Sequence, residues 1–479
     1  MGESTVKELL SRAIDEGRKA GGSFIDVRVE EAMFEGVEAE DGQPKEAGYG
    51  VDQGVGARAL AGGSWGFSAS QLVEGREAET VRDAVLRAVK LAKAVRSASQ
   101  PIELAEVRTV EDEIPASFEV NPFSVPVEEK MALCTEATQR MVKLDPAVKK
   151  AVAGISSLRV EKTFCSSEGT YIRQGQVVTF GHLYANALKE GNSEVYSHTE
   201  GGCRGFEVLK EYDLVEHSEE IAQKTLNLAG ARAAPTVKAP VLLDQDFVAL
   251  LIHEVVGHPS EADRVLGKEA AWAGRAWWND KVGEQVFSEK LNIVSDAMLS
   301  GYLGSFKYDD EGVPAKRVTH IERGCLREFL HSRETAKVMG AEPNGAMRAA
   351  GYLYAPLIRM TNTFLDRGDW KFEEMLEGFD GFYLKGGNVP SIDSRRYNFK
   401  ISAKEAYRVE KGEIREPLRG AALTGTSKEF LSSVDAVGSD LQMLPIPNCG
   451  KGEPMQVMRV GNGGPHLRGY GSVMGVEVS

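Results

Sequence analysis

The segment FVALLIHEVVGH (Phe247–His258) is predicted to form a helix, yet it runs directly into Pro259. Gly257 is a residue type that often ends a helix. A residue that precedes proline is disfavoured in the α conformation, so His258 is expected to leave the regular helix. The chain must therefore distort near Gly257, either by ending the helix or by forming a one-residue π-type bulge.

This distortion matters because the segment contains two histidines, His253 and His258, with Glu254 between them. In the H-E-x-x-H pattern of zinc sites the two histidines are four residues apart and share one helical face. Here they are five apart, and a regular helix would point them about 140° apart. A bulge at Gly257 would swing the second imidazole back towards the first. The alternative is two unrelated, partly buried histidines.

A catalytic zinc ion usually has three protein ligands and one water, so a third ligand is required. The candidates that the residue types allow are Glu261, Asp263, His320, Cys325, His331, Cys449 and His466. Cys449 stands between Pro447 and Gly450 in a segment where a sharp turn is expected, and a thiolate binds zinc well. A lone cysteine is also commonly a small buried apolar side chain. Spacing alone does not choose among these residues.

The hydrophobic pattern predicts an α+β fold in two domains, residues 1–235 and 236–479. Residues 1–235 are expected to form an α/β domain with antiparallel hairpins, one around Gly62-Gly63 and several short strands in residues 150–207. Residues 77–95, 127–144 and 215–229 have helical periodicity. The segment ARAAPTVKAP (Ala231–Pro240) is the predicted linker. Residues 236–479 are expected to be β-rich and to carry the histidine-containing helix.

Charge, hydropathy and cysteine content indicate which partners and which compartment the sequence favours. The 479 residues carry a net charge of −14, which disfavours nucleic acid and anionic membrane surfaces. No apolar stretch approaches the length of about 18 residues that a membrane-spanning helix needs. The five cysteines are scattered and form no C-x-x-C, which is typical of a protein in the reducing cytoplasm.

Several ordered motifs together resemble one family. HEVVGHPSEAD (His253–Asp263) is followed by DDEGVP (Asp309–Pro314), RMTNTFL (Arg359–Leu365), RGAALTGTS (Arg419–Ser427) and NCGKG (Asn448–Gly452). Near the N-terminus, GVGARALAGGSWGFS (Gly54–Ser68) resembles an early hairpin of the same family. This set of motifs resembles the TldD/PmbA family of metallopeptidases, and the retained histidines make the chain similar to its metal-binding, TldD-type branch.

The resemblance implies that His253, His258 and Cys449 bind the metal and that Glu254 is the catalytic base. It also implies an α/β N-terminal domain and a β-rich C-terminal domain. Active members of the family pair into dimers around an enclosed cleft, so the resemblance implies a dimer. The partner would be a second copy of the chain or a metal-free paralogue. The hypothesis is a cytoplasmic zinc-dependent peptidase that acts on peptides or unfolded protein segments. It would bind one zinc ion per chain, and another divalent transition metal is the alternative.

Two other functions are compatible with the residues. A peptide-binding or regulatory subunit would hold a structural metal with four protein ligands. A di-metal hydrolase would use Glu261 and Asp263 as bridging ligands; in a one-metal site these carboxylates would instead be hydrogen-bond partners of the imidazoles. Trp272, Trp277 and Trp278 are interpreted as the lining of a substrate cleft, as a partner surface or as core. Gly386-Gly387 is either a hairpin turn or a place where a peptide strand is added.

Overall fold

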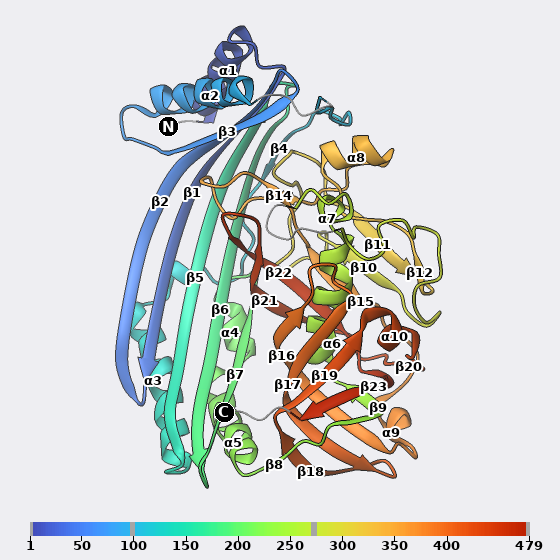
Figure 1. The fold of residues 1–479 in the computed structure, drawn as a ribbon. Coiled ribbons are helices and arrows are strands. Elements are labelled where there is room, and N and C mark those ends of the chain that lie inside the picture. The colour runs from blue at the N-terminus through green and yellow to red at the C-terminus, as the bar shows by residue number, and fades with distance from the viewer. Residues whose placement is uncertain (1–2, 96–100, 270–274, 476–479) are drawn as a thin grey trace.

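The computed structural model describes residues 3–95, 101–269 and 275–475 (Figure 1). A long bent sheet forms one side of the molecule, and two further sheets form the other side, with the helix that carries His253 between them (Figure 1). The α+β prediction with a β-rich C-terminal half is confirmed. None of the described helices is long and apolar enough to cross a membrane.

The first sheet has seven strands in the order β3-β2-β1-β5-β6-β4, with β7 also paired to β6. Its strands are β1 (Phe24–Glu40), β2 (Gln43–Ala61), β3 (Ser64–Gln71), β4 (Glu111–Ile114), β5 (Val148–Ser166), β6 (Tyr171–Lys189) and β7 (Asn192–Gly202). The predicted hairpin at Gly62-Gly63 joins β2 to β3, and both glycines have positive φ.

The prediction of several short strands in residues 150–207 is wrong, because β5 and β6 each continue for 19 residues. Glycines that resemble turn signals in the sequence lie inside these strands. A Cβ atom at Gly154, for example, would lie 2.2 Å from the ring of His182 on the neighbouring strand. This glycine allows a close approach between strands and does not mark a turn.

Helices cover the two ends of this sheet (Figure 1). They are α1 (Glu3–Lys19), α2 (Glu77–Ala94), the short 3-10 helix η1 (Pro122–Ser124), α3 (Val127–Leu144), α4 (Glu207–Glu211) and α5 (Leu214–Ala229). The predicted helices at 77–95, 127–144 and 215–229 correspond to α2, α3 and α5. Their apolar faces bury two separate clusters against the sheet, one near each end.

The second half contains an eight-stranded sheet in which an additional pairing of β16 with β17 closes a ring of strands. Its members are β8 (Arg232–Ala233), β9 (Val237–Leu243), β16 (Gly381–Ile392), β17 (Asn398–Glu410), β18 (Glu413–Arg419), β19 (Ala421–Thr426), β20 (Ala436–Val437) and β23 (Leu467–Gly475). The predicted linker therefore supplies two strands, β8 and β9. The domain boundary at residue 235 stays a prediction.

A six-stranded sheet, with the order β12-β11-β10-β15-β22-β21, lies beside this ring. It comprises β10 (Ile293–Asp296), β11 (Arg317–Glu322), β12 (Cys325–Leu326), β15 (Asn362–Leu365), β21 (Gln442–Lys451) and β22 (Gln456–Gly464). A separate pair is formed by β13 (Met347–Arg348) and β14 (Leu357–Ile358). Short helices α8 (Arg333–Met339), α9 (Phe372–Leu376) and α10 (Ser427–Ser432) connect the strands.

Helix α6 (Gln245–Ile252) packs between β16 on one side and β15 and β22 on the other. The Asp244 side chain starts the helix by accepting a hydrogen bond from the N–H of Phe247, a typical N-cap. Val248, Leu251 and Ile252 are fully buried. Burial of each such side chain stabilises the fold by about 1.5–3 kcal/mol. The C-terminal end of α6 is therefore held rigidly against both sheets.

A buried arginine ties the first sheet to the second half. The Arg58 guanidinium on β2 lies 2.5 Å from the Asp26 carboxylate and 3.2 Å from Glu311, which belongs to the DDEGVP motif. Removing one partner from a buried ion pair typically costs about 3–5 kcal/mol. Together with the Lys162–Asp310 and Arg333–Glu168 ion pairs, this contact joins the first sheet to the second half of the chain.

Candidate metal and catalytic centre

The helix that starts at α6 changes its winding at His253. Residues His253–Gly257 form a π-helix (η2), followed by a 3-10 helix at His258–Ser260 (η3) and a short helix α7 (Ala262–Val265). The backbone N–H of His258 donates to the carbonyl oxygen of His253, five residues earlier. Of the two distortions predicted from the sequence, a helix end and a π-type bulge, the structure has the π-type bulge.

One part of that prediction is wrong. His258 keeps α-helical backbone angles, with φ −60° and ψ −45°, although proline follows it. The wider π turn accommodates the extra residue, so the chain does not have to leave the helical region. Pro259 then falls in the first turn of the 3-10 helix, where its missing N–H leaves no hydrogen bond unmade.

Gly257 is needed for space and not for an unusual φ. A Cβ atom at this position would lie 2.0 Å from Sδ of Met360. The following turn is fixed from the other side, because Nε1 of Trp278 donates to the carbonyl oxygen of Pro259 at 2.9 Å. Packing on both sides thus holds the π turn in place.

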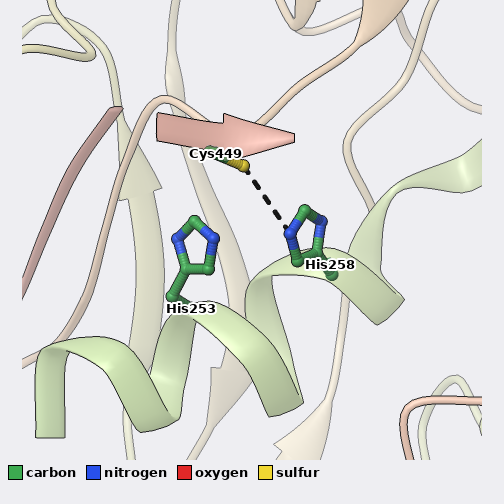
Figure 2. Close-up of side chains that lie close together, drawn as sticks. All are labelled: His253, His258 and Cys449. Atoms are coloured by element: carbon green, nitrogen blue, oxygen red, sulfur yellow. Dashed lines mark hydrogen bonds between the residues drawn. The ribbon is translucent and has the colours of Figure 1, made fainter. Parts of the chain in front are cut away.

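The π turn brings the two imidazoles together with a thiol (Figure 2). The rings of His253 and His258 have centroids 4.8 Å apart and are nearly perpendicular. Sγ of Cys449 lies 3.6 Å from Nε2 of His258. The ligand atoms of all three residues lie within 4.8 Å of one another. Zinc–sulfur and zinc–nitrogen bonds of about 2.3 and 2.0 Å at tetrahedral angles give a sulfur–nitrogen separation of about 3.5 Å, so the donor set fits zinc.

His253 is oriented by an amide. Its Nδ1 lies 3.0 Å from Oδ1 of Asn462 on β22, and the Asn462 amide donates in turn to the carbonyl oxygen of Thr363. Because that second bond uses the amide nitrogen, Oδ1 faces the imidazole and accepts a hydrogen bond from the protonated Nδ1. Nε2 of His253 therefore keeps its lone pair for a ligand.

His258 is oriented by a carboxylate. Its Nδ1 lies 3.2 Å from Oε2 of Glu261, which also accepts from Nε of Arg264 at 2.8 Å and from Nζ of Lys451 at 3.1 Å. Burial alone would raise the pKa of Glu261, but Lys451 and His258 outweigh it and hold the pKa well below its usual value. The prediction that Glu261 binds an imidazole is confirmed. Asp263 instead pairs with Lys451, at 2.8 Å.

Cys449 is aimed at the imidazoles by an irregularity in β21, whose register shifts between Ile446 and Cys449. Such bulges redirect a side chain at the edge of a functional site. The buried guanidinium of Arg359 donates to the Cys449 carbonyl oxygen at 2.5 Å and fixes the strand. Burial raises the pKa of the Cys449 thiol, but the charges of His253 and His258 outweigh burial and set it well below its ordinary value.

Glu254 follows the first of these histidines directly and is 8% exposed. Its Oε2 accepts a hydrogen bond from Nη1 of Arg396 at 2.5 Å. Burial raises the pKa of Glu254, whereas His258, His253 and Arg396 together lower it to a value below its ordinary one. The carboxylate is therefore ionised at neutral pH and placed to accept a proton.

A cavity of about 410 Å³ opens over these groups. One wall is formed by residues 197–199 of β7, from the first sheet, and the others by residues 387–390 of β16 and residues 444–450 of β21. His253, Glu254 and His258 form its floor together with Arg396. A larger cavity of about 810 Å³ lies along α3, and its lining includes none of these four residues.

The other candidate ligands are engaged elsewhere. His320 contacts Ser295, His331 contacts Thr335, His466 contacts Asp440 and Tyr383, and Cys325 contacts Gln285. Among residues 3–95, 101–269 and 275–475, the one group of three or more histidine, cysteine or carboxylate residues close enough to hold an ion is His253, His258 and Cys449. The di-metal arrangement with Glu261 and Asp263 therefore has no support.

The tryptophans are core residues where the structure describes them. Trp277 and Trp278 are buried against Phe287 and Tyr397, so the idea that they line the cleft is wrong; Trp272 falls outside the described residues. Gly386 and Gly387 lie within strand β16 and not at a hairpin turn.

Three residues that contact the ligands or their partners, Asn462, Arg396 and Lys451, were not predicted from the sequence. Asn462 and Arg396 gave no recognisable signal. Lys451 stands two residues after Cys449 on one strand, and period-two alternation places such residues on the same face, so its position could have been inferred.

This chain resembles known proteins over most of its length. Sequence models of the PmbA/TldA metallopeptidases match three segments: domain 1 at residues 25–92, the central domain at 120–232 and the C-terminal domain at 236–472. A metalloprotease of Methanocaldococcus jannaschii is 36% identical over 94% of this chain and 97% of its own length. A zinc metalloprotease TldD homolog of Saccharolobus solfataricus is 27% identical over 95% of this chain and 97% of its own length.

Solved structures share the fold. TldE from Thermococcus kodakarensis has a TM-score of 0.75 at 18% identity, covering 98% of this chain and 100% of that one. The full-length sequence matches carry the family assignment, which the motifs of the sequence had predicted: the chain belongs to the TldD/PmbA (PmbA/TldA) family of metallopeptidases.

Proposed function

We propose that this protein is a zinc-dependent peptidase that hydrolyses peptides or unfolded protein segments inside the cavity. The observation that carries the proposal is the buried convergence of two imidazoles and one thiolate beside the Glu254 carboxylate, on the floor of a cavity. The relative from Saccharolobus solfataricus, which carries zinc in its name, supports the choice of metal. A donor set with one thiolate and two imidazoles also favours zinc over magnesium or calcium.

In the proposed site His253, His258 and Cys449 would hold one ion. A zinc ion held there would supply an acidified water and polarise the scissile carbonyl. Glu254 acts as general base: its carboxylate takes a proton from the water and later delivers it to the leaving amine. Asn462 and Glu261 keep each imidazole in the tautomer that presents Nε2.

The cavity supports a choice of substrate. Its volume of about 410 Å³ and its position between β7 and β21 suit a stretch of extended chain and not a folded domain. Leu250, Pro390 and Leu444 give it apolar walls. Among the described strands β7 pairs with β6 alone, and the register of β16 shifts between Asn388 and Pro390. Both strands line the cavity, so strand addition by the peptide is part of the proposal.

The alternative function is a peptide-binding or regulatory subunit with a structural metal. It requires a closed site with four protein ligands, whereas the described group has three. A structural site also has no use for an ionised carboxylate beside the ligands. The peptidase is therefore the function that the geometry supports best.

The proposal includes a dimer and a compartment. TldE from Thermococcus kodakarensis shares the fold, and we propose either a homodimer or a heterodimer with a metal-free paralogue. The five cysteines are all free, which supports a reducing cytoplasm. A negatively charged protein of this kind is proposed to have neither nucleic acid nor membrane as a partner.

The test is a comparison of Glu254→Gln with the wild-type protein after zinc loading. We expect the variant to bind one zinc ion per chain and to lose hydrolysis of an unfolded peptide by about 10²–10⁴-fold. The control is Glu413→Gln, an exposed carboxylate on β18, which should leave hydrolysis unchanged. Normal turnover by Glu254→Gln would overturn the assignment of the base, and zinc-loaded wild-type protein that cleaves no peptide would overturn the peptidase.

A further inference from the structure

Arg396 has a backbone conformation that residues other than glycine adopt uncommonly. It lies in the turn between β16 and β17 with φ +61°, the left-handed region that favours glycine. The neighbouring Asp393 carboxylate accepts hydrogen bonds from the N–H groups of Tyr397 and Asn398, and the Ser427 hydroxyl donates to the Arg396 carbonyl oxygen at 3.0 Å. Such over-determined strain is concentrated at functional sites.

The turn delivers the guanidinium into the cavity. Arg396 is 8% exposed, lines the cavity, and donates from Nη1 to Oε2 of Glu254 at 2.5 Å. The preceding residue, Arg395, is exposed. Stability alone does not account for the arrangement, because a buried ion pair is often no more stabilising than an apolar pair of similar size.

Other cations near the site are committed to other carboxylates. Among the described residues that line the cavity, the lysine and arginine side chains are Lys404 and Arg396. The Lys404 ammonium pairs with Asp246 at 2.9 Å. Arg396 differs because its partner is the group whose charge changes during the proposed reaction.

When Glu254 accepts a proton from water, its carboxylate becomes neutral. The water oxygen forms a bond to the carbonyl carbon at the same time, and the π electron pair of the carbonyl moves to its oxygen. One negative charge thus disappears beside Arg396 while another forms on the substrate. When the C–N bond breaks, its electron pair leaves with the amine, which receives the proton from Glu254, while an electron pair of the oxyanion re-forms the carbonyl and the Glu254 carboxylate is restored.

We propose that Arg396 is a further catalytic residue, whose guanidinium transfers its ion pair from Glu254 to the oxyanion of the tetrahedral intermediate. This role rests on the proposed peptidase function and is separate from the roles of the three ligands and of Glu254. A preorganised donor in a cavity sheltered from water stabilises such a charge strongly. The planar guanidinium carries several N–H donors, so it can contact first the Glu254 carboxylate oxygen and then the oxyanion.

The experiment uses the full-length, zinc-loaded protein with the variants Arg396→Gln, Arg396→Lys and, as a matched control from the same turn, Arg395→Gln. Each is measured for zinc content, for kcat and KM on a peptide that the wild-type protein cleaves, and for the dissociation constant of that peptide's phosphinic analogue, a tetrahedral anion. We expect Arg396→Gln to keep one zinc per chain and a KM within about 3-fold, while kcat falls by about 10²–10³-fold.

The phosphinic analogue separates an oxyanion contact from a role in positioning Glu254. Its affinity should fall in Arg396→Gln by a factor similar to kcat, recover in part in Arg396→Lys, and stay unchanged in Arg395→Gln. Unchanged affinity for the analogue in Arg396→Gln would overturn the proposal while leaving the peptidase intact. Zinc-loaded wild-type protein that cleaves no peptide would overturn the peptidase and this role with it.

Discussion

The backbone N–H of His258 donates a hydrogen bond to the carbonyl oxygen of His253, and this bond spans five residues where an α-helix would span four. The π turn therefore restores the relative direction that an H-E-x-x-H helix obtains from its regular winding. Since π turns are rarer and less favourable than α turns, they persist where surrounding packing holds them. Here Met360 packs against one side of the turn and Trp278 fixes the residues that follow it.

The first prediction concerns this packing. Gly257→Ala places a methyl group 2.0 Å from Sδ of Met360, so we expect a loss of about 1–3 kcal/mol in the free energy of unfolding and weaker zinc binding. Combining it with Met360→Ala should cost less than the sum of the two single changes, because the new methyl then has space. The control is Gly425→Ala, where a Cβ meets no atom within 4 Å. Urea unfolding measures the free energy of unfolding, and zinc titration measures the affinity for zinc. Additive effects of the two substitutions in the double variant would contradict this account.

The second prediction concerns the thiolate. Cys449→Ser replaces the sulfur ligand, so we expect zinc content to fall from one ion per chain to nearly none. Zinc at about 100 times its dissociation constant stabilises a folded protein by about 2.7 kcal/mol, and this stabilisation should vanish in the variant. Cys325→Ser, whose thiol contacts Gln285 away from the site, is the control. The measurements are metal analysis and thermal unfolding with and without zinc. If the Cys449→Ser protein still binds one zinc ion tightly, Cys449 is not a ligand.

The third prediction concerns the carboxylate behind His258. Glu261→Gln leaves the buried Lys451 and Arg264 with less negative charge nearby. Asp263 still pairs with Lys451 and Glu269 with Arg264, so we expect the free energy of unfolding to fall by about 3 kcal/mol, the lower end of the range for breaking a buried ion pair. Zinc affinity should fall by about 10–100-fold, since the imidazole loses its charged partner. Glu413→Gln, at an exposed pair with Arg415, should change stability by less than about 1 kcal/mol. Equal effects of the two substitutions would contradict the role given to Glu261.

The fourth prediction concerns pH and a histidine outside the metal site. Burial lowers the pKa of His320 from 6.5 to about 4. Between these values the unfolded chain binds a proton that the folded protein does not, so stability is lost as the pH falls from 6.5 towards 4. The loss amounts to about 3 kcal/mol over this window.

The measurement is urea unfolding of zinc-free wild-type protein and His320→Gln across this pH range. The difference between their free energies of unfolding should change by about 3 kcal/mol from pH 6.5 to pH 4, in the direction that makes the variant relatively more stable in acid. A difference that is constant with pH would show that His320 is not neutral in the folded protein at pH 4 to 6.5.

Helices were predictable from sequence to a greater degree than strands. The periodicities of α2, α3 and α5 appear directly in the sequence, because one apolar face packs on a sheet and the opposite face meets solvent. Strand lengths were not predictable. Glycine serves in this sheet as a point of close approach, as at Gly154, and a single sequence does not distinguish that use from a turn.

The residues of the candidate metal site were predictable where they are close in sequence or belong to a family motif. The His253–His258 distortion follows from neighbouring residues, and Cys449 came from the family resemblance. Arg396 lies 142 residues from Glu254, and Asn462 lies 209 residues from His253. Such contacts depend on how β17 and β22 are placed in their sheets, which local pattern does not determine.

The cavity wall contributed by β7 has a consequence for how such a protein can diversify. Residues 197–199 belong to the first sheet, whereas the three proposed ligands and Glu254 all belong to the second half of the chain. A substitution on this strand can alter the fit of an incoming chain without disturbing the coordination geometry. Selection can therefore act on recognition and on bond cleavage through separate parts of the gene, provided that the Arg58–Glu311 contact keeps the two halves in register.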